Sequence, residues 1–180
     1  DSWGSSARTP HAASRVSCAV PSADCGNARA GHAARQRGLP SARVIVATNE
    51  NDVLHEFFLT GRYRPRVATE THATSSPSMD ISKASNFERY AFDLAGRDPE
   101  QFGELWRRLQ SDSQCALADT PMSPRVRAPG FASANSPPTG RLATLDHDHR
   151  RFDQFLHPPS PDRLSRGIDS LDTRQSQLCR

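Results

Sequence analysis

Lysine is almost absent from this chain of 180 residues. Lys83 is the single one, so arginine supplies all but one of the 23 basic residues. The arginines are scattered along the sequence and form no stripe, which argues against a nucleic-acid-binding groove. Any reaction that needs a side-chain amine therefore has one candidate residue in the whole sequence.

Long apolar runs are also missing. Only 35% of the residues are hydrophobic, and no run approaches the length of a membrane span or the apolar core of a signal peptide. The four cysteines, Cys18, Cys25, Cys115 and Cys179, show no C-x-x-C spacing and no metal-ligand pattern. We therefore expect a cytoplasmic protein with reduced thiols and no membrane partner. The start at Asp1 rather than methionine is consistent with a fragment.

Several catalytic motifs are absent as well. The sequence contains no G-x-S-x-G, no P-loop and no G-x-G-x-x-G, so hydrolase and nucleotide-binding functions lack support. The run Asp146 to His149 alternates acids and histidines, but in a polar tail it is more typical of solvated chain than of a metal site. Cys25 precedes a helix and could be an activated thiol, yet no motif supplies a histidine partner.

The ordered part of the chain alternates strands and helices. Flanking turn residues and periodicity predict strands over 16–20 and 44–47 and helices over 28–38 and 53–60. Residues 49–52 offer side chains that could cap the second of these helices, and Gly61 would end it. This order is typical of an α/β fold with parallel strands and crossover helices.

Two further helices follow. Ser85 and Glu88 form a capping-box pattern before a helix over 86–95, and Asp98-Pro99 predicts the start of another. One face of that last helix would carry Phe102, Leu105, Trp106 and Leu109. We divide the chain into an irregular segment 1–15, an α/β domain 16–117, and a Pro-, Arg- and Ser-rich tail 118–180 that we expect to be irregular or disordered.

Two runs resemble one enzyme family. They are Val-Ile-Val-Ala-Thr-Asn-Glu-Asn-Asp-Val-Leu (Val44 to Leu54) and Ser-Ser-Pro-Ser-Met-Asp-Ile-Ser-Lys-Ala-Ser-Asn-Phe-Glu-Arg (Ser75 to Arg89). With the Gly38-Leu39-Pro40 turn and the Thr60-Gly61-x-Tyr63 stop, they resemble the C-terminal half of threonine synthase over about residues 16–117. The resemblance implies a partial three-layer domain with a parallel sheet, as in fold-type-II pyridoxal-phosphate enzymes of the tryptophan synthase β kind.

The resemblance also implies a reaction. Members of the family convert O-phospho-L-homoserine and water to L-threonine and phosphate, with pyridoxal 5′-phosphate bound through a lysine of the N-terminal half. The cofactor supplies the electron sink, and the protein positions the reactants. We expect this chain to begin after the region of that Schiff-base lysine. Lys83 does not replace it by motif, because it precedes a helix start and is typical of a solvated surface lysine.

The family's phosphate-binding turn corresponds to Ser22-Ala23-Asp24-Cys25-Gly26-Asn27. In the family this turn reads close to Thr-Gly-Asn-Phe-Gly-Asn, and its N–H groups hold the cofactor phosphate at a helix N-terminus. Gly26 and Asn27 are kept. Asp24 instead places a carboxylate beside the phosphate, a repulsion of about 4 kcal/mol per unit charge at 4 Å and an effective dielectric of about 20.

Two functional hypotheses follow. The first is a piece of threonine synthase that is inactive alone, with no catalytic residue and no metal site of its own. The second is a non-enzymatic α/β module that self-associates or binds a partner through an exposed apolar face. Residues 48–52 could line the substrate cleft or simply cap a helix. The loss of pattern after Leu117 could reflect a shifted reading frame.

Overall fold

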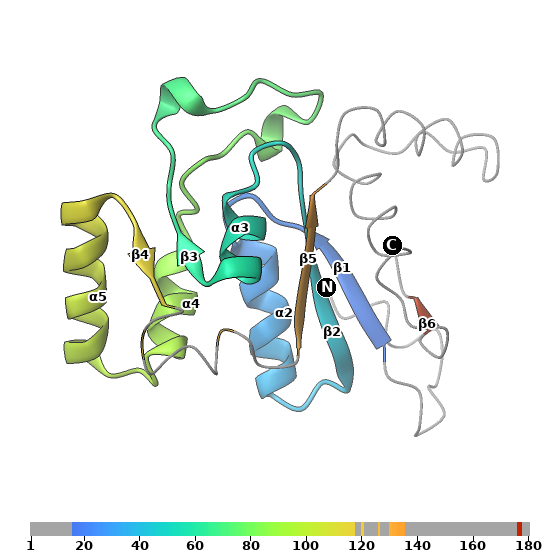
Figure 1. Cartoon of the computed structure of the whole chain (residues 1–180). Coiled ribbons are helices and arrows are strands. Elements are labelled where there is room, and N and C mark those ends of the chain that lie inside the picture. The colour runs from blue at the N-terminus through green and yellow to red at the C-terminus, as the bar shows by residue number, and fades with distance from the viewer. Residues whose placement is uncertain (1–15, 118–119, 121–125, 127–129, 136–175, 178–180) are drawn as a thin grey trace.

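A computed structural model of the chain describes residues 16–117, 120, 126, 130–135 and 176–177 (Figure 1). The elements within these residues, in chain order, are β1 (Val16–Pro21), α2 (Gly26–Gln36), β2 (Ser41–Thr48), α3 (Val53–Thr60), β3 (Arg62–Tyr63), η1 (Ala68–Glu70), η2 (Pro77–Met79), α4 (Phe87–Leu94), α5 (Pro99–Asp112), β4 (Cys115–Ala116), β5 (Phe131–Asn135) and β6 (Ser176–Gln177). The two η elements are single 3-10 turns.

The main sheet is parallel. Its strand order is β5-β2-β1-β6, and each neighbouring pair runs in the same direction. The unit β1-α2-β2 therefore confirms the expected α/β fold with a parallel sheet and a crossover helix. Strand β5 lies in the region expected to be irregular and was not foreseen, although it pairs with β2 along its whole length. Most of the expected tail lies outside the described residues.

Strand β2 occupies the centre of the described sheet. Residues 44–48 are all buried, as a β-branched run between two parallel neighbours requires. Helix α2 packs on this strand, and a Cβ added at Gly31 would come within 2.9 Å of a Val44 methyl group. The helix begins at Gly26, two residues before the predicted start.

An aromatic cluster packs between α3, β3 and α4. Phe57 of α3 packs edge-on against Phe87 of α4 with ring centroids 4.7 Å apart, and Tyr63 stacks on Phe87 at 3.8 Å. Figure 1 shows α2 between the sheet and α4, with α5 on the far side of α4. Leu105 and Leu109 of α5 are buried, and Phe102 and Trp106 pack on the core more loosely, so the predicted apolar face is confirmed.

The structure confirms two of the predicted helix ends and contradicts a third. The Asp98 carboxylate accepts hydrogen bonds from the N–H groups of Glu100 and Gln101, as Asp98-Pro99 indicated. Gly61 ends α3 in the left-handed region, at φ 74°. In contrast, α4 begins after Asn86 with no side-chain cap, so the capping box of Ser85 and Glu88 is wrong.

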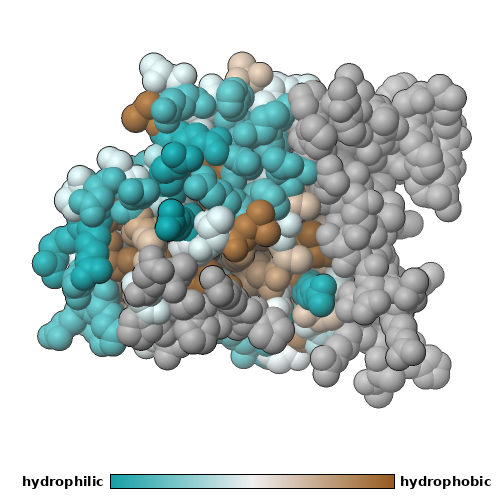
Figure 2. Space-filling view, in the orientation of Figure 1, coloured by the Kyte–Doolittle hydropathy of each residue, from teal (hydrophilic) through white to brown (hydrophobic). Residues whose placement is uncertain are grey.

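The surface of the described residues carries both hydrophilic and hydrophobic side chains. Figure 2 shows hydrophilic colour over the segment between β3 and α4 and hydrophobic colour lower on the same face. The large hydrophobic side chains that are exposed among the described residues are Leu39, Leu59 and Val67, which lie on three separate segments. No helix in this part of the chain combines the length and apolar character that a bilayer span needs.

Candidate functional site

The six residues of the predicted phosphate turn form the connection from β1 to α2. Strand β1 ends at Pro21 and α2 begins at Gly26, so the turn lies at the carboxyl end of a parallel strand, where open α/β sheets bind ligands. The Ser22 N–H donates to the Ala47 carbonyl at 3.1 Å, which ties the turn to β2. The Asn27 side chain donates back to the Pro21 carbonyl at 2.8 Å. The structure thus brings these residues together at the carboxyl end of the sheet.

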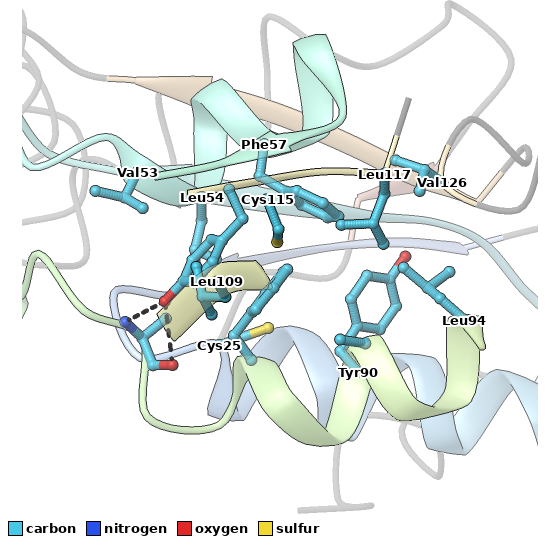
Figure 3. Packing of buried hydrophobic residues seen from close by; sticks show 14 of the residues in the cluster. Cys25, Val53, Leu54, Phe57, Tyr90, Leu94, Leu109, Cys115, Leu117 and Val126 are labelled. Carbon is cyan, nitrogen blue, oxygen red and sulfur yellow. Dashed lines mark hydrogen bonds between the residues drawn. The ribbon is translucent and has the colours of Figure 1, made fainter. Parts of the chain in front are cut away.

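Cys25 turns the chain into α2. It adopts a left-handed conformation, φ 70°, that L-residues rarely take, and its side chain is buried among apolar residues that include Phe57 and Tyr90 (Figure 3). Burial raises the pKa of the Cys25 thiol to about 12; the Asp24 carboxylate adds to the rise, and Arg29 opposes it. A thiol held protonated in this way is a packing group, not a nucleophile.

Asp24 is engaged in hydrogen bonds on both carboxylate oxygens. Oδ1 accepts the Gly26 N–H at 2.9 Å, and Oδ2 accepts the Asn86 side-chain amide at 3.0 Å. The Asp24 carbonyl also accepts the Asn86 backbone N–H at 2.9 Å. We call this arrangement the Asp24–Asn86 clamp. It joins the turn to the start of α4.

Two buried hydroxyls lie next to the turn. Ser22 Oγ and Thr48 Oγ1 have no hydrogen-bond partner among the described residues, and both residues are at least 98% buried. Pro21 pairs with Ala47 in the parallel register, so Ser22 and Thr48 follow at the ends of adjacent strands and project to the same face. Buried hydroxyls ordinarily form hydrogen bonds. A ligand with a hydrogen-bond acceptor would therefore be bound favourably next to Ser22 and Thr48.

Residues 49–52 do not cap α3, contrary to the simpler of the two expectations. Asp52 occupies the N-cap position without a side-chain cap bond. Asn49 and Asn51 are instead buried and donate their amides to the Asp80 carboxylate at 2.9 and 3.2 Å. Thr74 completes this network with a hydroxyl bond to Asp80 of 2.6 Å. The network fixes the segment between β3 and α4 over the carboxyl end of β2.

Lys83 lies outside the predicted phosphate turn. Lys83 is exposed, between the buried residues Ser82 and Ala84, as its motif context indicated. No group of three histidine, cysteine, aspartate or glutamate residues in the described part of the chain could hold a metal ion. The run 146–149 lies outside the described residues.

A hollow of about 570 Å³ opens at the other end of the sheet. It is lined by residues that include His32, Leu39, Tyr90 and Phe131, close to where β2 and β5 begin. Burial lowers the pKa of His32 there. None of residues 22–27 lines this hollow, so it is separate from the predicted phosphate turn.

The chain is similar to threonine synthases in sequence and in structure. It is 47% identical to the threonine synthase of Methylobacillus glycogenes over 166 residues, covering 92% of this chain and 35% of that protein. It is 50% identical to that of Corynebacterium glutamicum over 149 residues, covering 82% and 31%. The crystal structure of PLP-bound threonine synthase from Brucella melitensis matches 98% of this chain and 36% of its own, with a TM-score of 0.82 and 29% identity. This chain is related to the threonine synthases.

The similarity to threonine synthases extends further than the sequence patterns indicated. A match over 166 residues is longer than the range 16–117, so the resemblance does not stop at Leu117, and a shifted reading frame is not needed to explain the tail. The yeast threonine synthase structure agrees, with a TM-score of 0.80 and 25% identity over 91% of this chain and 35% of its own. No family model matches the chain. The chain spans about a third of the length of the curated relatives it matches.

The turn of this threonine synthase relative does not fit a phosphate group as it stands. At Gly26, the first residue of α2, an added Cβ would lie 3.1 Å from Asp24 Oδ1 and 3.4 Å from the Asn86 amide nitrogen. The space above the glycine is therefore already filled by a carboxylate and its partner. A phosphate dianion would have to displace that carboxylate or lie beside it against charge repulsion.

Proposed function

We propose that this chain supplies part of the α/β scaffold of a threonine synthase that uses pyridoxal 5′-phosphate to form L-threonine from O-phospho-L-homoserine. The observation that carries the proposal is the joint sequence and structural similarity to threonine synthases, one of them PLP-bound. We propose that residues 22–27 form the turn that faces the cofactor phosphate. When bound, the cofactor supplies the electron sink for the reaction.

The contribution of the chain is positioning. The Asn49, Asn51 and Asp80 network holds the segment between β3 and α4 against the carboxyl end of β2, which is where a substrate of an open α/β sheet would lie. Buried and mutually bonded polar groups of this kind lose little entropy when a ligand arrives, because they are already ordered. We propose that this segment forms one wall of the substrate cleft.

The 180-residue chain by itself is proposed to be inactive. Its single lysine, Lys83, is exposed and lies outside the turn, and the turn is closed by Asp24. The chemistry of such enzymes requires a covalent hold on the cofactor aldehyde, and a closed phosphate site weakens binding of the cofactor. We also propose a cytoplasmic location, where the thiols of Cys18, Cys25 and Cys115 would stay reduced.

A hybrid enzyme tests the proposal. In it, this chain replaces the matching segment of the Methylobacillus glycogenes threonine synthase. The hybrid is expected to form threonine from O-phospho-L-homoserine once the pyridoxal phosphate concentration is raised, since its scaffold is the same and its phosphate turn is closed. A second hybrid carrying Asp80→Asn separates positioning from folding, because it should raise KM more than it lowers kcat. A folded, cofactor-loaded hybrid that forms no threonine would contradict the proposal.

Self-association, the alternative function, gains no specific support from the part of the chain that the structure describes. Leu39, Leu59 and Val67 lie on separate segments, whereas an interface would need a contiguous apolar surface. Self-association stays a prediction. Light scattering tests it, because a dimer would have twice the mass of the single chain.

A further inference from the structure

The Asp24 carboxylate accepts the Gly26 N–H in the first turn of α2, the kind of donor that binds anions at helix N-termini. We infer that the Asp24 carboxylate is the resident anion of the β1-α2 turn, held there by Asn86, and that the turn admits phosphate only when this carboxylate is neutralised or displaced. The inference rests on the proposed function for the class of ligand, a phosphate monoester, and adds that the chain itself blocks the site.

The first support is the hydrogen bonding of the clamp. The N–H of Gly26 is in the first turn of α2, where the partial positive charge of the helix favours an anion, and it donates to Asp24 Oδ1 at 2.9 Å. The second oxygen of Asp24 takes the Asn86 amide at 3.0 Å. Both oxygens of the carboxylate are therefore used in the way that two oxygens of a bound phosphate would be.

The second support is the orientation of the Asn86 amide. Arg89 donates to Asn86 Oδ1, so the amide nitrogen of Asn86 must face Asp24. An uncharged asparagine at position 24 offers one oxygen only, and its own NH₂ would face either the Gly26 N–H or the Asn86 NH₂. Asp24→Asn therefore removes the charge and opens the clamp while keeping the size of the side chain.

The third support lies outside the clamp. Ser22 starts the same turn, is 2% exposed, and its Oγ has no partner among the described residues. Thr48, at the end of the neighbouring strand, has the same property. A buried hydroxyl without an acceptor costs free energy, so the corner retains donors for an anion larger than the carboxylate that now fills it.

The test is a titration of the full chain with inorganic phosphate, followed by ¹⁵N-¹H NMR of the Gly26 and Asn27 amides at constant ionic strength. The variants are Asp24→Asn and, in case that variant does not fold, Asp24→Ser, whose short side chain does not reach Asn86. Asp112→Asn, an exposed acid at the end of α5, is the charge-matched control. Asn86→Ala keeps the carboxylate and removes its partner.

Asp24→Asn is expected to bind phosphate roughly 100-fold more tightly than the unmodified chain. Asp112→Asn should show no gain, and Asn86→Ala should gain much less than Asp24→Asn because its negative charge remains. Equal affinities of the unmodified chain and Asp24→Asn, or an equal gain in Asp112→Asn, would overturn the inference. Pyridoxal 5′-phosphate is titrated in parallel. If Asp24→Asn binds inorganic phosphate but not the cofactor, the closure by Asp24 is supported, and the hybrid enzyme decides the proposed function separately because it supplies the lysine that this chain lacks.

Discussion

The Asn49 side-chain amide donates a 2.9 Å hydrogen bond to the Asp80 carboxylate, across 31 residues of sequence. The same oxygen accepts the Asn51 amide and the Thr74 hydroxyl, and the other oxygen accepts the Thr74 N–H. One carboxylate thus joins the end of β2 to the segment before α4. Because its donors are part-buried to buried, this network contributes to stability as well as to the shape of the proposed substrate wall.

Asp80→Asn tests that network. The new NH₂ group would face donors that now point at a carboxylate, leaving at least one of them unpaired at a cost of about 2–3 kcal/mol. Urea unfolding should show this loss of stability, and hydrogen exchange should quicken for the Thr74 N–H. Asp112→Asn, on the exposed end of α5, should stay within about 0.5 kcal/mol of the parent. Equal stabilities of the two variants would contradict the role of Asp80.

Alanine substitutions at two helical glycines should have opposite effects on stability. At Gly31 the new Cβ would come within 2.9 Å of a Val44 methyl, so Gly31→Ala should destabilise by about 1 kcal/mol despite the better helix propensity of alanine. At Gly103 nothing lies within 4 Å of an added Cβ. Gly103→Ala should therefore stabilise by about 1 kcal/mol. Thermal unfolding of the pair measures both, and a stabilising Gly31→Ala would show that α2 can move away from β2.

The cap of α5 predicts a dependence on pH. Hydrogen bonds from the Glu100 and Gln101 N–H groups lower the pKa of Asp98 below its ordinary value of 3.8. Because the folded pKa is the lower one, ionised Asp98 stabilises the fold at neutral pH, and this contribution is lost as pH falls through the folded pKa. Asp98→Ala should lower Tm at pH 7 but have little effect below the folded pKa. Asp98→Asn, which can still cap, should lower Tm less; a pH-independent difference for Asp98→Ala would contradict this account.

Cys25 and Cys115 should be unreactive in the folded chain. Burial raises their thiol pKa values to about 12 and about 11, so at pH 8 almost no thiolate is present. Alkylation by iodoacetamide, followed by peptide mapping, should be at least about 100-fold slower at both residues than in guanidinium chloride. Rapid labelling of native Cys25 would show that the turn opens readily or that the thiol is activated.

The local parts of the fold were predictable from sequence. The β-branched run Val44 to Val46 indicated a buried parallel strand, Gly61 the end of α3, and Asp98 the start of α5, because each signal depends on residues within one turn or one strand. The position of the turn 22–27 between a strand and a helix was predictable in the same way. At these positions propensity, capping and hydrophobic pattern agree.

The parts that depend on distant residues were not predictable. Strand β5 has the weakly apolar sequence Phe-Ala-Ser-Ala-Asn, and its structure comes from pairing with β2 rather than from its own propensity. The sequence left two roles for Asn49, capping a helix or lining the substrate cleft, and could not show that its amide bonds to Asp80. The Asp24–Asn86 clamp spans 62 residues, so a sequence comparison could flag the charge of Asp24 but not the partner that holds it.

The most direct test of the central claim uses the single lysine. The isolated chain is incubated with pyridoxal 5′-phosphate and O-phospho-L-homoserine, threonine is quantified, and any cofactor adduct is reduced with borohydride and located by peptide mass spectrometry. A chain that is a threonine synthase scaffold without its own cofactor site should form no threonine and give no adduct on Lys83 beyond that of the unfolded chain. Threonine formation that is abolished by Lys83→Arg would contradict the account.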